Sequence, residues 1–101
     1  MDRIQRITEM EKACDDVTAA IRALSDAAVR YEKLQGSYRK LSAYYGSARW
    51  RGDLEADEKG LLPSELKRGV LSEDGLYDLM TENRELAVRL LRLTARMVEN
   101  G

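Results

Sequence analysis

The sequence predicts an all-α protein built around a long antiparallel helical hairpin or coiled coil. Two observations predict this fold class. Apolar residues recur three and four positions apart over residues 2–45 and again over residues 73–99, which is the spacing of a helix packed against another helix. Between these segments lie the only Pro, the only Trp and four of the seven Gly, a composition typical of a connector. The 101 residues are predicted to form one helical domain.

The first helix is predicted over residues 2–45. At roughly 1.5 Å per residue, an unbroken helix of this length would reach about 65 Å, whereas a compact domain of this size has a radius of gyration of only about 13 Å. The molecule is therefore elongated or the helix breaks, and we predict the break near Gly36 because Gly costs about 1 kcal/mol in a helix interior. One heptad position holds Ile7, Cys14, Ile21 and Ala28, and the other holds Met10, Val17, Leu24, Tyr31, Tyr38 and Tyr45.

The connector, residues 46–71, begins with capping residues. Gly46 predicts the end of the first helix, since glycine enters the left-handed conformation without a steric cost. Ser47 follows as the N-cap of a short helix from Ala48 to about Glu58, because its hydroxyl can accept from an exposed backbone N–H. Gly60 is predicted to end that helix.

A second short helix is predicted from Pro63 to Arg68, with Pro63 in its first turn and Gly69 at its end. Ser72 is the clearest helix start in the chain, because acidic residues follow it and favour the positive end of the helix dipole. The last helix is predicted over residues 73–99. Its apolar stripe holds Leu76, Leu79, Leu86, Leu90, Leu93 and Met97, and a second stripe beside it holds Tyr77, Met80, Ala87, Leu91 and Val98.

Charge placement predicts how the helices are oriented. Residues 2–16 carry three basic and five acidic side chains, a net charge of −2, whereas residues 22–40 carry five basic and two acidic ones, a net charge of +3. The last helix repeats this polarity. An antiparallel hairpin would bring each acidic half against a basic half. Exposed ion pairs contribute only ~0–1 kcal/mol each, so they select the orientation of the helices more than they stabilise the fold. Two antiparallel copies of the first helix would show the same complementarity, so a homodimeric bundle is the alternative.

Composition excludes several classes of function. The net charge of −1 gives no overall field that would attract nucleic acid or an anionic membrane, and no apolar run is long enough to span a bilayer. The N-terminal residues lack the apolar core of a secretory signal, and the lone Cys14 fits a reducing cytoplasm. The chain has no His, which removes the commonest general base and metal ligand. We therefore expect a cytoplasmic protein without a membrane partner.

Short motifs in the middle of the chain carry a family resemblance. They are Tyr44-Tyr45, Ser47, Trp50, Asp53, the acidic run to Gly60, Leu62-Pro63, Leu66-Lys67, the run from Gly69 to Asp74, Tyr77-Asp78 and the run from Asn83 to Leu86. With these motifs the chain resembles the bacterial domain-of-unknown-function 4298 family of small proteins. Outside them, the likeness is the general pattern of an amphipathic helix.

The resemblance implies a small, helical, cytoplasmic bacterial protein, and it implies no activity. The chain departs from the family pattern at Arg68, where the family often has Cys, and at Gly75, where the family has a larger residue. No role for a thiol is therefore carried over to position 68.

An acidic run in the connector suggests a divalent-metal site, because carboxylate oxygens suit Ca²⁺ or Mg²⁺. The candidate ligands are Asp53, Asp57 and Glu58, with Glu55 between them. The spacing does not match the calcium loop, which needs Gly at its sixth position, where this chain has Glu58. The alternative is a solvated helix face with ion pairs to Arg49, Arg51 and Lys59.

An aromatic group beside the acidic run is the candidate partner-binding surface, since Trp, Tyr and Arg dominate interface hot spots. It consists of Tyr44, Tyr45, Trp50 and Leu54. The structural alternative is that these residues fill a small core where the connector folds over the helix ends. Stacking on nucleic-acid bases is disfavoured, because phosphate contacts need uncompensated positive charge.

The sequence thus points to a non-catalytic protein–protein interaction module, an adaptor or an inhibitor, with an unidentified protein partner or a second copy. The alternative is a carboxylate-based, metal-dependent enzyme or sensor centred on residues 53–58. No residue pattern indicates a catalytic group or a cofactor.

Overall fold

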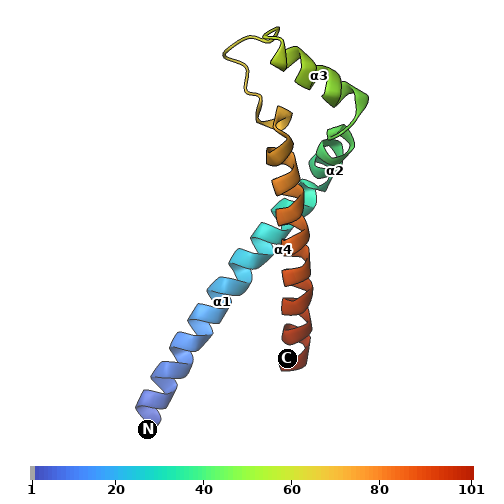
Figure 1. Ribbon diagram of the computed structural model, residues 1–101. Coiled ribbons are helices and arrows are strands. Elements are labelled where there is room, and N and C mark those ends of the chain that lie inside the picture. Colours follow the sequence, from blue (N-terminus) through green and yellow to red (C-terminus); the bar gives the residue numbers. More distant parts are fainter. Residues whose placement is uncertain (1) are drawn as a thin grey trace. The chain divides into compact units, whose positions relative to one another are not determined.

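The computed structural model describes residues 2–101, and it confirms the predicted all-α class (Figure 1). Residues 2–101 contain no strand. The chain divides into two compact units, Met1–Tyr38 and Arg39–Gly101. The sequence pattern predicts a single domain. The elements in chain order are α1 (Arg3–Lys33), α2 (Gln35–Tyr44), α3 (Ala48–Glu58), the 3₁₀ helix η1 (Gly69–Leu71) and α4 (Glu73–Asn100).

Helix α1 starts at a capping box formed by Asp2 and Gln5. The Asp2 side chain accepts from the backbone N–H of Gln5 at 2.7 Å, and the Gln5 side chain accepts from the backbone N–H of Asp2 at 3.3 Å. This reciprocal pair satisfies two N–H groups that a helix start otherwise leaves without partners. No residue of α1 is buried, so the helix contributes no side chain to a core.

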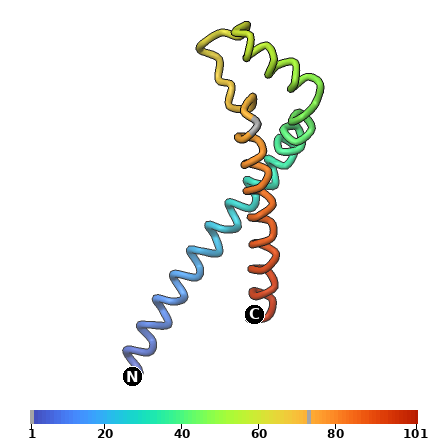
Figure 2. Tube along the Cα trace, in the orientation of Figure 1, coloured from blue at the N-terminus to red at the C-terminus, as the bar shows by residue number. Residues whose placement is uncertain are grey.

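The first helical segment is interrupted at Leu34, two residues before the predicted break at Gly36. Figure 2 traces this part of the chain in cyan to green. The Leu34 backbone N–H bonds to the carbonyl of Tyr31 at 2.9 Å, a separation of three residues that tightens the last turn. Helix α2 follows at once, and Gly36 lies inside it. The hydrogen-bond register therefore shifts at the helix end, and the glycine is accommodated within the next helix.

The connector holds α3 between two capping motifs. Ser47 is the N-cap of α3, and its hydroxyl accepts from the backbone N–H of Trp50 at 3.2 Å. At the other end Gly60 has φ of 70°. Its N–H bonds to the Asp57 carbonyl and the next N–H, of Leu61, bonds to the Ala56 carbonyl, both at 3.0 Å, which is the hydrogen-bond pattern of a Schellman motif.

The predicted short helix over residues 63–68 is wrong. Those residues form a turn, in which the Leu66 N–H bonds to the Pro63 carbonyl at 3.2 Å. Gly69, predicted to end a helix, instead begins η1. The physical reason is that the Arg68 side chain binds the carbonyl oxygens of Pro63 and Leu66, which a continuing helix would have used for backbone hydrogen bonds.

A small core lies within the unit Arg39–Gly101. Its members are Trp50 from α3, Leu71 from η1 and Leu76 from α4, which are 5%, 8% and 3% exposed. Ser72 is the N-cap between η1 and α4, and its hydroxyl accepts from the Gly75 N–H at 3.2 Å. Capping therefore turns the chain directly from η1 into α4, which brings Leu71 and Leu76 into the same core.

Candidate functional site

Trp50, in the aromatic group predicted to bind a partner, belongs to the small core. The Trp50 indole Nε1 donates to the Val70 carbonyl at 3.0 Å, and the Tyr45 ring meets the Trp50 ring edge-on with centroids 5.1 Å apart. Leu54 is half-buried. Because Trp50 is 5% exposed, its side chain is largely unavailable to a partner, and the structure favours the packing role.

Tyr44, the remaining member of the aromatic group, links the end of α2 to α3. Its hydroxyl donates to Asp53 Oδ2 at 2.6 Å. This hydrogen bond, with smaller contributions from burial and from the carboxylate charge, raises the pKa of Tyr44 above its usual value of 10.0. One oxygen of Asp53, a predicted metal ligand, thereby accepts a hydrogen bond from a protein donor.

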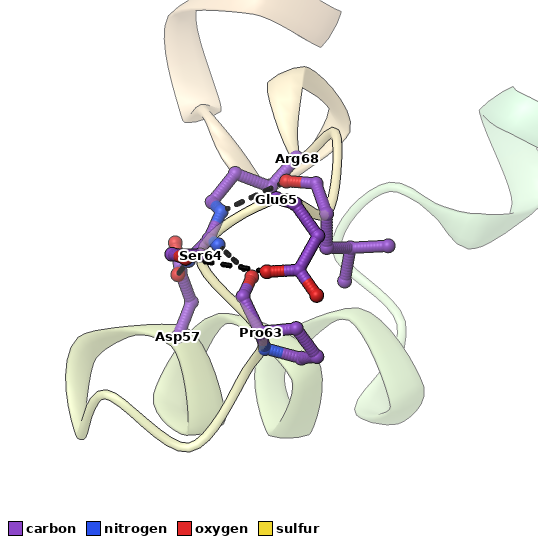
Figure 3. Close-up of polar contacts among 6 residues, drawn as sticks. Asp57, Pro63, Ser64, Glu65 and Arg68 are labelled. Atoms are coloured by element: carbon purple, nitrogen blue, oxygen red, sulfur yellow. Dashed lines mark hydrogen bonds and ion pairs between the residues drawn. The ribbon is translucent and has the colours of Figure 1, made fainter.

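The second predicted metal ligand, Asp57, belongs to an arginine-centred cluster (Figure 3). The Arg68 guanidinium forms an ion pair with Asp57 and donates to the Pro63 carbonyl. Arg68 Nε also donates to the Leu66 carbonyl at 3.3 Å. The Arg68 and Asp57 side chains are 30% and 23% exposed, so the pair is partly shielded from water. Arg68 thus fastens the turn after α3 to α3 itself.

The remaining carboxylates of the acidic run lie at the surface. Glu55 pairs with Lys59 at 2.7 Å, one helical turn away, and both side chains are more than 60% exposed. Glu58 is exposed. Among the side chains that the structure describes, no three of His, Cys, Asp or Glu gather closely enough to hold a metal ion. The metal hypothesis stays a prediction that this geometry does not favour over the ion-pair interpretation.

The sequence pattern places Leu76 on the apolar stripe of the last helix, but it does not indicate Arg68 and Leu71 as organising residues, nor the core that Leu71 shares with Leu76. The apolar pattern around Ser72 contains a usable signal for the two leucines, because Leu71 and Leu76 flank the N-cap and its first turn, where a hydrophobic contact commonly fixes the entry of the chain. Arg68 has no such local signal, since its ion-pair partner Asp57 is eleven residues away.

The α1 seam, defined as the two heptad positions of α1, lies at the surface except at Tyr31, which is half-buried. Ile7 is 54% exposed, Val17 58% and Ile21 60%, and the Cys14 thiol is free and exposed. An apolar stripe of this length on one helix is larger than the scattered apolar residues that normal surfaces carry. The seam is therefore a candidate interaction surface.

Helix α4 carries a second exposed apolar stripe and a basic face. Leu91 and Val98, in the second stripe, are 72% and 76% exposed. Four arginines line a shallow open groove along the helix together with Glu85. They are Arg84, Arg89, Arg92 and Arg96. No helix in the described part of the chain has the length and apolar character that crossing a bilayer requires.

These features define a small all-α protein with one short-range core and two exposed apolar helix faces. The sequence profile of the family described as "Domain of unknown function (DUF4298)" matches residues 7–93, and the chain belongs to this family. No curated protein and no solved structure matches it.

Proposed function

We propose that the protein is a non-catalytic interaction module of the bacterial cytoplasm, which acts as an adaptor or an inhibitor of a larger protein. The observation that carries this proposal is the exposed α1 seam on a helix of 31 residues without a buried side chain. Most helices in proteins gain their stability by packing an apolar face. A helix supplied by another chain would cover the α1 seam and provide that packing.

The apolar stripe on α4 extends the proposal. Leu91 and Val98 lie two turns apart on one face and are among the most exposed apolar residues described. Contiguous exposed apolar surface bordered by charged side chains is characteristic of protein–protein contact sites, and the basic face of α4 borders this stripe on one side, with Arg92 about a quarter turn around the helix from Leu91. An adaptor needs two contact surfaces, and the α1 seam and the α4 stripe supply them.

Site-specific photo-crosslinking in cells tests the proposal. A photoreactive phenylalanine replaces Val17 on the α1 seam and, as the matched control, Ala19, which lies on the opposite side of the same helix. We expect a discrete adduct from position 17, absent from position 19, that disappears when Ile21→Asp places a charge in the seam. Identical adducts from both positions, or no adduct from either, would contradict the interaction role.

A further inference from the structure

We infer that the α1 seam packs antiparallel against the α1 seam of a second copy of this chain, so that the protein is a homodimer. This inference rests on the proposed interaction role: a second copy covers the α1 seam, and the α4 stripe stays available for the larger protein. Three properties of α1 support it: the pairing of its seam residues, the volumes that this pairing brings together and the distribution of its charges.

One antiparallel register pairs the residues of the seam with one another. When Val17 lies opposite Ile21 of the second copy, Cys14 lies opposite Leu24 and Met10 lies opposite Ala28. Each layer then combines one residue from each heptad position, as interdigitating seams require. The contact is two-fold symmetric, since every pair occurs twice, which is the arrangement of most homodimers.

Side-chain volume favours this register over a parallel one. In a parallel pair Cys14 would face Cys14 and Ala28 would face Ala28, so these layers would each hold two small side chains. Met10 would face Met10, so that layer would hold two long ones. In the antiparallel register each small side chain meets a long one, Cys14 with Leu24 and Ala28 with Met10. Even filling of successive layers is what close-packed protein interiors require.

The charges of α1 favour the same orientation. Residues 2–16 carry a net charge of −2, and residues 22–33 carry three basic and two acidic side chains, a net charge of +1. Antiparallel packing sets these opposite charges side by side, and parallel packing would set like against like. The helix dipole accounts for the basic end of this polarity only, because Arg30 and Lys33 lie in the last turn whereas α1 has no acidic residue in its first turn, and the effect of the dipole falls off within one turn.

The mass of the purified full-length chain tests the inference first. Sedimentation equilibrium should give twice the chain mass at high concentration and a concentration-dependent return to the monomer on dilution. Ile21→Asp, which places two charges near the symmetry axis, should weaken the dimer by at least about 30-fold, the effect of losing an interface hot spot. Trp50 lies outside the unit Met1–Tyr38, so its fluorescence should remain unchanged and report an intact core.

Disulfide trapping tests the orientation. With the native Cys14 retained, Leu24→Cys should give a cross-linked dimer under mild oxidation, because residues 14 and 24 face each other across the interface. A bond within one chain is excluded, since these residues are about 15 Å apart along the helix and a disulfide needs Cα atoms within about 7 Å. The wild-type chain and the opposite-face variant Ala19→Cys should remain uncross-linked.

Each alternative outcome has a distinct meaning. A Cys14–Cys14 disulfide in the wild-type chain would show a parallel pair and overturn the inference. A monomer at every concentration would also overturn it. If the monomer still gave a seam-specific adduct with a different protein in the photo-crosslinking experiment, the interaction role would stand with another partner, and without such an adduct both proposals would fail.

Discussion

The two units of the molecule differ in what holds their helices in place. The unit Arg39–Gly101 contains Trp50, Leu71 and Leu76, the buried apolar side chains of the described residues, and capping and hydrogen bonds enclose them. Helix α1 of the other unit has no fully buried side chain, and its local support includes its capping box and the exposed pair of Lys12 with Asp16. The unit Arg39–Gly101 can fold on its own contacts, whereas helix α1 needs an external surface to pack against.

The substitution Trp50→Ala should have the largest effect on stability, because it removes the core that distinguishes the unit Arg39–Gly101 from α1. It removes the largest core side chain and the hydrogen bond to the Val70 carbonyl, and Trp→Ala changes in cores cost about 3–5 kcal/mol. Urea unfolding followed by circular dichroism should show the loss. Trp50→Phe, which keeps an aromatic ring but not the N–H donor, should lose less. Equal stability of wild type and Trp50→Ala would mean that the small core does not hold this unit together.

The substitution Arg68→Ala should have the next largest effect. It removes the ion pair with Asp57 and the donor to two carbonyl groups, and charge-assisted hydrogen bonds in a partly shielded site are worth about 1–2 kcal/mol. Arg68→Lys should not restore the loss, because an ammonium cannot reproduce the planar fork of the guanidinium. Unfolding monitored by Trp50 fluorescence measures both variants.

The exposed pair of Lys59 with Glu55 supplies the matched control for Arg68. Lys59→Ala should cost only about 0.3–0.5 kcal/mol, the usual value of an exposed pair one helical turn apart. If Lys59→Ala and Arg68→Ala cost the same, the arginine cluster would be an ordinary surface contact.

The smallest expected effect concerns pH. The Tyr44 hydroxyl donates to Asp53, and because this bond raises the pKa of Tyr44 above 10.0, its contribution is full below the unfolded pKa. The contribution is lost as pH rises through the folded pKa. Tyrosinate absorbance should show a late-titrating tyrosine that Tyr44→Phe removes and Asp53→Asn shifts to lower pH. An unchanged titration of Asp53→Asn would show that the bond is absent in solution.

Local chemistry explains which parts of the fold the sequence could predict. Ser47, Gly60 and Ser72 act through hydrogen bonds or backbone angles within four residues of themselves, so their capping roles are readable from short motifs. The helical period of residues 2–45 and 73–99 is also a local property. These signals were sufficient for the all-α class and for the start of α4.

Contacts across longer separations explain what the sequence could not predict. Residues 63–68 contain good helix formers, yet they form a turn and not a helix, in which Arg68 pairs with Asp57 eleven residues earlier in the chain. The Trp50 indole bonds to a carbonyl twenty residues on, which placed a predicted partner-binding side chain inside the core. A carboxylate pattern likewise cannot distinguish a metal ligand from the ion-pair partner that Asp57 proves to be.

Thermal unfolding at several protein concentrations, followed by two signals, tests the contrast between the units most directly. Far-UV circular dichroism reports all helices, including α1, and the fluorescence of Trp50, the single Trp, reports the small core. Because association stabilises by mass action, the circular dichroism should contain a transition whose midpoint rises with concentration, while the fluorescence midpoint stays constant. A single transition, coincident in both signals and independent of concentration, would contradict the account.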